Sequence, residues 1–374
     1  MSRAFARTDN SILGNWWWTI DKWIFTSIFI LIGIGILLNF AASPAVANTI
    51  NVNMYHFIKK QLFLMPVAVL IIITLSLQSP KYIRYFSIGA FCFFMLLVML
   101  TPFLGTEIKG ATRWISLFGF SIQPSEFLKP LFVVVSASLF ALPDNGKRIN
   151  SHMIATFLFL FVISFLVIQP DIGMSLVIST VWATQFFIAG LPIIWVVALA
   201  CCGVVGIITA YFTLQHVQLR IDRFLHPEGG LSYQVRRSLE AFSDGGLFGV
   251  GPGEGKVKFH LPDAHTDFIF AVAGEEFGLI FCLCIVTLFA IVVIKSFNLI
   301  MKEKDMFIIL AVTGLAVQFG LQALINMASS LHLMPTKGMT LPFISYGGSS
   351  LISSSIGIGM LLGVTRKRIV QGTN

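Results

Sequence analysis

Long apolar runs separated by short polar segments make up most of the chain. Ten runs approach the length of about 20 residues that carries a helix across about 30 Å of hydrocarbon. They lie at approximately 23–44, 61–78, 84–103, 124–142, 154–169, 173–190, 192–214, 267–295, 306–328 and 345–364. The segments between them are too short for a separate soluble domain, except at about 215–266. The pattern predicts an all-α, polytopic membrane protein in which residues 1–374 form one transmembrane domain with one long loop.

The positions of Lys and Arg predict the orientation of these helices, because cytoplasmic loops are enriched in them. With the N-terminus inside, the short outer loops carry only Lys59, Lys60, Lys109, Arg113 and Lys337. Both termini are therefore expected in the cytoplasm and the long loop outside. That loop has its own cations, which suggest an anionic partner there: Arg220, Arg223, Arg236, Arg237, Lys256 and Lys258.

Composition agrees with a membrane protein, since 56% of residues are hydrophobic and only 11% are charged. The net charge of +8 is modest, so we interpret it as topology and anionic-lipid contact and expect no nucleic-acid partner. All five cysteines fall inside predicted spans, which supports neither a disulfide framework nor a zinc site.

A cluster of ionisable residues lies where the long loop meets the eighth predicted span. Asp267 is expected in the first turn of that helix, where it serves either as a catalytic carboxylate or as a helix N-cap. His260, Asp263, His265 and Asp267 together could hold a divalent cation, Mg²⁺ or Mn²⁺. We favour the interpretation without a dedicated metal site, and no other cofactor is indicated.

Two more polar groups occur at predicted helix ends. Glu126 and Lys129 are three residues apart at the start of the fourth span, so they share one face. They form either a structural ion pair or part of a substrate path. Arg113 and Trp114 lie at the same outer interface, where the indole could anchor the chain and the guanidinium could contact a phosphate.

Other motifs have plainer interpretations. Asp171 is expected to cap the helix that follows it. At least one of Glu275 and Glu276 should face a polar cavity, because neighbouring helix residues point about 100° apart. The glycine-rich segment 249–255 lacks the flanking features of nucleotide-binding loops, so a structural turn is favoured over a phosphate contact. The segment 233–242 is expected to form a short amphipathic helix.

Taken together, these motifs resemble the SEDS family of bacterial cell-wall polymerases over nearly the whole chain. The matching motifs, in family order, are GATRW at 110–114, QPSE at 123–126, QPDIG at 169–173, HTDF at 265–268 and KGMTLPF at 337–343. The segments GVGPGEG at 249–255, PDAHTD at 262–267 and GEE at 274–276 look more like division-type members than elongation-type members.

The resemblance implies a ten-helix enzyme that polymerises lipid II into glycan strands at the outer face of the cytoplasmic membrane, at the division septum. The family's catalytic Asp matches Asp267, and its further site residues match Glu126, Lys129, Arg113 and Trp114. His265 and Lys337, in the matching motifs, are expected to contact the substrate. The implied partners are lipid II, a class B penicillin-binding protein and other division membrane proteins.

Two other functions remain open at this stage. Charged residues inside a helical bundle also mark transport paths, so the chain could be a lipid II flippase. It could also be a non-catalytic scaffold that activates its penicillin-binding partner. A flippase needs no outer-face carboxylate positioned to take a proton, whereas a polymerase does.

Overall fold

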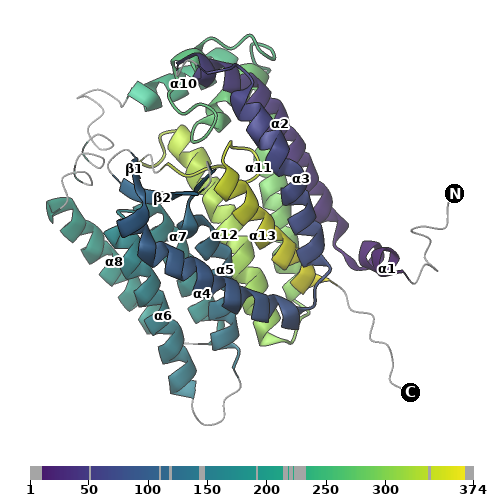
Figure 1. Cartoon of the computed structure of the whole chain (residues 1–374), viewed down its shortest axis with the longest axis vertical. Helices are drawn as coiled ribbons and strands as arrows, with labels where there is room; N and C mark the ends of the chain where they lie inside the picture. Colours follow the sequence, from purple (N-terminus) through teal and green to yellow (C-terminus); the bar gives the residue numbers. More distant parts are fainter. Residues whose placement is uncertain are drawn as a thin grey trace.

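The protein is a bundle of long helices with a small sheet and a folded loop at one end (Figure 1). The computed structural model describes residues 11–49, 52–108, 111–117, 120–142, 148–190, 193–213, 218, 222, 233–335 and 338–366. The long helices are α2 (Lys22–Thr49), α3 (His56–Ser76), α4 (Pro80–Leu104), α5 (Pro124–Phe140), α6 (Arg148–Ile168), α7 (Ile172–Ile188), α8 (Ile193–Thr213), α11 (Ile269–Ile300), α12 (Met306–Ser330) and α13 (Gly348–Thr365). Each of the ten predicted spans therefore coincides with a helix.

Seven of these helices are long and apolar enough to cross a membrane by length and composition, namely α2, α3, α4, α6, α11, α12 and α13. Within the described ranges, α7 and part of α8 form shorter apolar helices. These observations confirm the prediction of a mainly helical, polytopic membrane protein.

Three helices form the centre of the bundle. In its most apolar window α13 is 78% buried and α12 is 67% buried, against 22% for α6. α13 packs against α3 and α5, and α12 packs against α5, α7 and α11. Buried residues cover nearly every position of α5, whereas α4 and α6 keep apolar faces that are exposed and suited to lipid.

Both ends of the bundle carry additional elements. The short helix α1 (Ile12–Thr19) lies at one end, and α10 (Tyr233–Gly245) lies at the other (Figure 1). We call the second the α10 end. Because successive helices alternate in direction, α3, α5, α7, α11 and α13 all begin at the α10 end and α12 finishes there.

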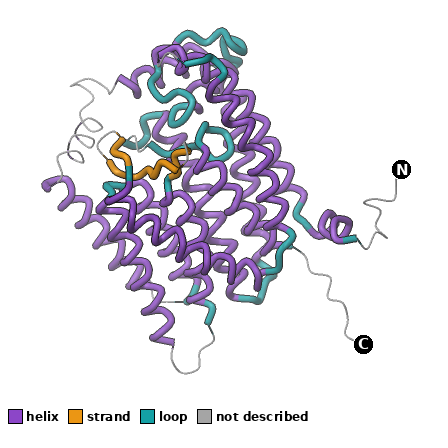
Figure 2. The backbone as a smooth tube through the Cα atoms, viewed as in Figure 1, coloured by secondary structure: helices purple, strands orange, loops and turns teal. Residues whose placement is uncertain are grey.

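A three-stranded antiparallel sheet connects α4 to α5 at the α10 end (Figure 2). Its strands are β1 (Thr106–Ile108), β2 (Ala111–Leu117) and β3 (Phe120–Ile122), in the order β1-β2-β3. The sequence analysis predicted no strand here, because two of the strands are only three residues long and carry little periodic signal.

The expected amphipathic helix in the long loop is confirmed as α10, and a 3-10 helix, η2 (Val257–His260), follows it. α10 packs on α11, and its Ser238 hydroxyl donates to the carbonyl of Ser330 at the end of α12 over 2.7 Å.

The glycine-rich segment between α10 and η2 fits into a break in α11. Gly278 has φ 79° and ψ −178°, a conformation essentially restricted to glycine. At this break the N–H of Leu279 donates to the carbonyl of Gly246 over 3.0 Å, and the N–H of Val250 donates to that of Glu275 over 2.9 Å. The segment is thus a structural turn, as favoured from sequence.

Glu275 and Glu276 hold this turn against α11. The Glu275 carboxylate accepts from the N–H groups of Val257 at 2.7 Å and Lys258 at 3.0 Å, and Glu276 accepts from the N–H of Gly253 at 3.0 Å. The Lys258 ammonium pairs with Glu276. Both glutamates are only 1% exposed, and the backbone of this loop and Lys258 supply the polar surroundings expected for at least one of them. The cations of the long loop suggested an external anionic partner. For Lys258 the anion is instead Glu276 of the same chain.

Candidate active site

Asp267 lies in a tight turn just before α11. Asp263 adopts a left-handed backbone conformation with φ 57°, and its carbonyl accepts from the N–H groups of Thr266 at 3.0 Å and Asp267 at 3.1 Å. α11 begins at Ile269 with Phe268 as its N-cap residue. The prediction that Asp267 belongs to the first helical turn is therefore wrong, because the turn at Asp263 delays the start of the helix.

The segment 338–347, which leads into α13, holds this turn from the other side. The N–H of Tyr346 donates to the carbonyl of His265 over 2.8 Å, and the Ser345 hydroxyl donates to that of Thr266 over 2.6 Å. A Cβ atom placed on Gly338 would lie 3.4 Å from Oδ2 of Asp267. The half-buried Asp267 carboxylate thus lies beside the beginning of that segment.

Asn326 of α12 joins the two segments. Its side-chain Nδ2 donates to the carbonyl of Asp267 over 2.9 Å and to that of Met339 over 2.6 Å. The residue is 1% exposed, and its hydrogen bond to Met339 is buried while the one to Asp267 is partly buried. Asn326 therefore fixes the backbone on which the Asp267 carboxylate is carried.

Glu126 and Lys129 form the ion pair expected from their spacing. The Lys129 Nζ lies 2.9 Å from Oε2 of Glu126, and the two side chains are 1% and 10% exposed. Nζ also donates to Oε1 of Gln322 over 2.9 Å, while Nε2 of Gln322 donates to the carbonyl of Thr340 over 3.1 Å. The pair is thereby linked to the same segment, 338–347, that contacts Asp267.

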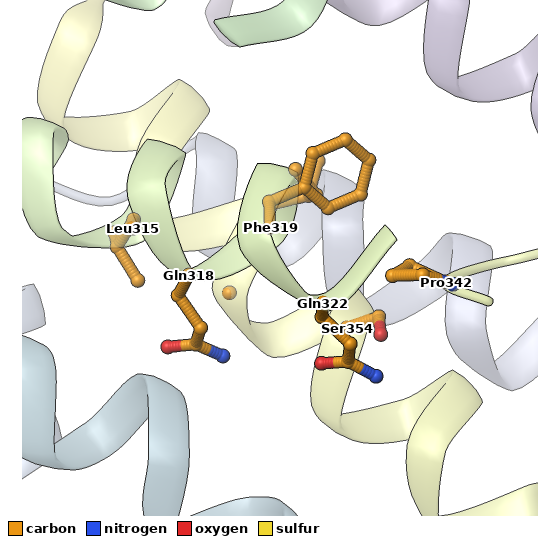
Figure 3. Close-up of a pocket in the computed structure, with 8 residues that line it drawn as sticks. Leu315, Gln318, Phe319, Gln322, Pro342 and Ser354 are labelled. Atoms are coloured by element: carbon orange, nitrogen blue, oxygen red, sulfur yellow. The ribbon is translucent and has the colours of Figure 1, made fainter. Parts of the chain in front are cut away.

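Gln322 and Asn326 were missed by the sequence analysis. Their spacing of four residues on a helix that is otherwise largely apolar puts two amides on one face, and this was the signal available. Gln322 and Pro342 also line a cavity between α12 and α13 (Figure 3). That cavity has room for only about one water molecule. A sugar substrate would require these elements to separate.

Arg113 and Trp114 lie on β2. The Arg113 guanidinium donates to the carbonyls of Gln169 at 3.0 Å and Pro170 at 2.5 Å, and it lies 3.9 Å from the Asp171 carboxylate. It therefore clamps the turn between α6 and α7. The half-buried Trp114 pairs with Thr106 across the sheet. Contact of Arg113 with a phosphate stays a prediction.

Asp171 caps α7, as expected, by accepting from the N–H of Met174 over 3.4 Å. Burial raises the pKa of the Asp171 carboxyl above its ordinary value, and the neighbouring Arg113 guanidinium opposes that shift. The clamp thus places a buried acid beside a partly exposed cation at the start of α7.

His265 is buried in an aromatic cluster. Its ring centroid lies 4.5 Å from that of Phe57 and 5.2 Å from that of Tyr346. Among the described residues, no three His, Cys, Asp or Glu side chains gather as a metal site, so His260, Asp263, His265 and Asp267 do not form one. Lys337 lies outside the described residues.

The chain is similar to known proteins over nearly its whole length. The family model FtsW/RodA/SpoVE, described as "Cell cycle protein", matches residues 22–369. A protein of Caulobacter vibrioides (strain NA1000 / CB15N), named "Probable peptidoglycan glycosyltransferase FtsW", is 42% identical over 98% of this chain and 94% of its own length. A protein of the same name from Trichlorobacter lovleyi is 35% identical over 92% of this chain and 93% of its own. The name FtsW confirms the division-type resemblance.

Two solved structures share the fold. A chain from a structure titled "Structural coordination of polymerization and crosslinking by a peptidoglycan synthase complex" has a TM-score of 0.76 at 24% identity, covering 92% of this chain and 97% of that one. RodA of Thermus thermophilus, a rod shape determining protein, has a TM-score of 0.67 at 24% identity, covering 93% and 97%. By the extent of the family match, the chain belongs to the FtsW/RodA/SpoVE family of cell cycle proteins.

Proposed function

We propose that this protein is a peptidoglycan glycosyltransferase that polymerises lipid II into glycan strands at the outer face of the cytoplasmic membrane. The observation that carries the proposal is the position of Asp267. Its carboxylate lies at the α10 end, half-buried, on a backbone fixed by Asn326 and by the segment 338–347. The names of the relatives from Caulobacter and Trichlorobacter support the same activity.

The reaction joins an acceptor sugar hydroxyl to the anomeric carbon of a donor sugar and releases the prenyl diphosphate of the donor. A sugar hydroxyl has a pKa far above neutrality, so a base within hydrogen-bond reach is needed as the new bond forms. Asp267 takes that proton. Displacement of an α-linked diphosphate to give a β-linked glycan implies a single inverting step.

Cations near the site stabilise the negative charge that develops on the leaving diphosphate. Lys129 is a buried cation that is linked through Gln322 to the segment 338–347 beside Asp267. Arg113 and Lys337 are further candidates. Because no three His, Cys, Asp or Glu side chains of the described residues gather as a metal site, Mg²⁺ or Mn²⁺, if used, would need diphosphate oxygens among its ligands.

The expected location and partners follow from the same family. With the α10 end outside, the Asp267 turn faces the compartment where glycan strands are assembled, and both termini are cytoplasmic. A class B penicillin-binding protein supplies the cross-linking activity, and further division membrane proteins bring both to the septum. The structural neighbour described as part of a peptidoglycan synthase complex supports such an assembly.

Reconstitution separates this proposal from its alternatives. The purified chain, with and without a class B penicillin-binding protein, would be placed in vesicles with fluorescent lipid II. We expect glycan polymer with the unmodified chain and polymerisation about 10²–10⁴-fold slower with Asp267→Asn. Movement of lipid II across the bilayer without polymer, equal in both proteins, would instead favour a flippase. Polymer made equally well by the unmodified chain and by Asp267→Asn in the presence of the partner would favour a scaffold.

A further inference from the structure

The first turn of α13 lacks a side-chain cap. α13 is 18 residues long, and its N-cap residue Gly347 makes no side-chain cap hydrogen bond. The hydroxyl of Ser349 instead accepts from the N–H of Gln123 over 3.0 Å, and that of Ser350 pairs with Thr340 over 2.5 Å. Ser349 and Ser350 are 6% and 7% exposed, so this helix end lies inside the protein. Its N–H groups and the positive end of the helix dipole favour an anion there.

A buried amide faces the same place without a partner. Gln61 of α3 is 4% exposed, and neither its amide oxygen nor its amide nitrogen has a hydrogen-bond partner within the described part of the chain. It lines a narrow cavity, which as it stands has no room for a water molecule, together with Tyr346, Gly347 and Gly348. Leaving two polar atoms of one side chain unpaired is costly, and natural proteins seldom retain such a group without a function.

The chemistry of these groups specifies their ligand. The N–H groups of α13 and the amide nitrogen of Gln61 are donors and require acceptors with negative charge. The amide oxygen of Gln61 requires a hydroxyl or N–H donor. A sugar diphosphate provides both, since its phosphate oxygens accept and its sugar hydroxyls donate.

The position of this cavity connects it with the Asp267 turn. Tyr346, which lines the cavity, donates its N–H to the carbonyl of His265, two residues before Asp267. Thr340, which pairs with Ser350, is also bonded through its carbonyl to Gln322, the partner of Lys129. Hydrogen bonds therefore connect the helix end both to the turn that carries the proposed base and to the partner of the buried cation.

We propose that the N-terminus of α13 and Gln61 form a binding site for the diphosphate of the lipid-linked sugar donor. The proposal rests on the proposed function and identifies the group that receives the leaving diphosphate. Leu64 of α3 closes the site: a Cβ atom on Gly348 would lie 3.0 Å from Cδ1 of Leu64. The site therefore opens when α3 moves away from α13. On opening, the helix N–H groups and Gln61 bind the diphosphate as its charge develops.

Binding of farnesyl diphosphate to the full-length chain in detergent tests the site without requiring polymerisation. Gln61→Met removes both polar atoms at similar volume and should weaken this binding about tenfold or more. The matched control is Gln318→Met, because Gln318 is 7% exposed, has an unpartnered amide oxygen among the described residues, and lines a different cavity. The control should bind as the unmodified chain does.

A second variant guards against simple misfolding. In Gln61→Glu a carboxylate would meet the α13 N-terminus and oppose a second anion there, so variant protein that still melts cooperatively should bind farnesyl diphosphate at least tenfold more weakly. Unchanged affinity of both Gln61 variants for farnesyl diphosphate would overturn the proposed site. The proposed function would still stand or fall on the separate measurement of lipid II polymerisation. Farnesol binding as tightly as farnesyl diphosphate would also overturn it. Inorganic diphosphate binding equally tightly, with the same dependence on Gln61, would assign the site to free diphosphate instead.

Discussion

Neutralising the buried pair of Glu126 and Lys129 distinguishes a structural role from a role in catalysis. At 2.9 Å their Coulomb attraction is about 6 kcal/mol for an effective dielectric constant of about 20, and desolvation of both groups offsets much of it. Lys129→Met leaves the Glu126 carboxylate buried without its cation, which should destabilise the protein by about 3–5 kcal/mol. The double variant Glu126→Gln with Lys129→Met removes both charges, so its stability should return to within about 1 kcal/mol of the unmodified chain.

Activity then separates the two roles. Melting in detergent and lipid II polymerisation would be measured for the two single variants, the double variant, and the charge swap Glu126→Lys with Lys129→Glu. We expect the double variant to fold but to polymerise poorly, because the cation is absent. The swap should also stay inactive, since a carboxylate at position 129 would face the Gln322 oxygen, which now accepts from Lys129. Near-normal polymerisation by the folded double variant would refute a catalytic role for Lys129.

Three further predictions concern the surroundings of the site. Glu254→Cys, at an exposed position of the long loop, should react with a membrane-impermeant maleimide in intact spheroplasts; reaction only after permeabilisation would contradict the orientation. Gly278→Ala should lower the level of folded protein, because its new Cβ would lie 2.4 Å from the Gly249 nitrogen. The control Gly33→Ala should be tolerated, because its Cβ would meet no atom within 4 Å. Equal levels of the two variants would argue against the break in α11. Asn326→Leu removes the side-chain hydrogen bonds to the carbonyls of Asp267 and Met339, so it should lower kcat about tenfold or more with a smaller change in KM. An unchanged kcat would show that Asn326 is not a positioning residue.

Most of the fold was predictable from local sequence patterns. The ten apolar runs became helices because each can satisfy its backbone internally, whatever its neighbours are. The pair of Glu126 and Lys129 was predictable for the same reason, since an i, i+3 spacing determines a shared face. Asp171 as a helix cap is likewise a local property.

Long-range contacts were not accessible from the sequence. Gln322 meets Lys129 across 193 positions, and Asn326 meets Asp267 across 59. The burial of Glu275 and Glu276 depends on a loop folding back across the break at Gly278, which no helical pattern reveals. Asp267 was assigned to the wrong local structure because a left-handed backbone at Asp263, a residue other than glycine, is uncommon.

The most direct test of the central claim is the rate of lipid II polymerisation by purified Asp267→Asn, reconstituted with its penicillin-binding partner beside the unmodified chain. Asn keeps the shape of the side chain but cannot accept the proton, so the rate should fall about 10²–10⁴-fold. Membrane level, melting temperature and partner binding should be unchanged, because the turn is held by backbone groups and by Asn326. A folded Asp267→Asn protein that polymerises at a near-normal rate would contradict the account of Asp267 as the base.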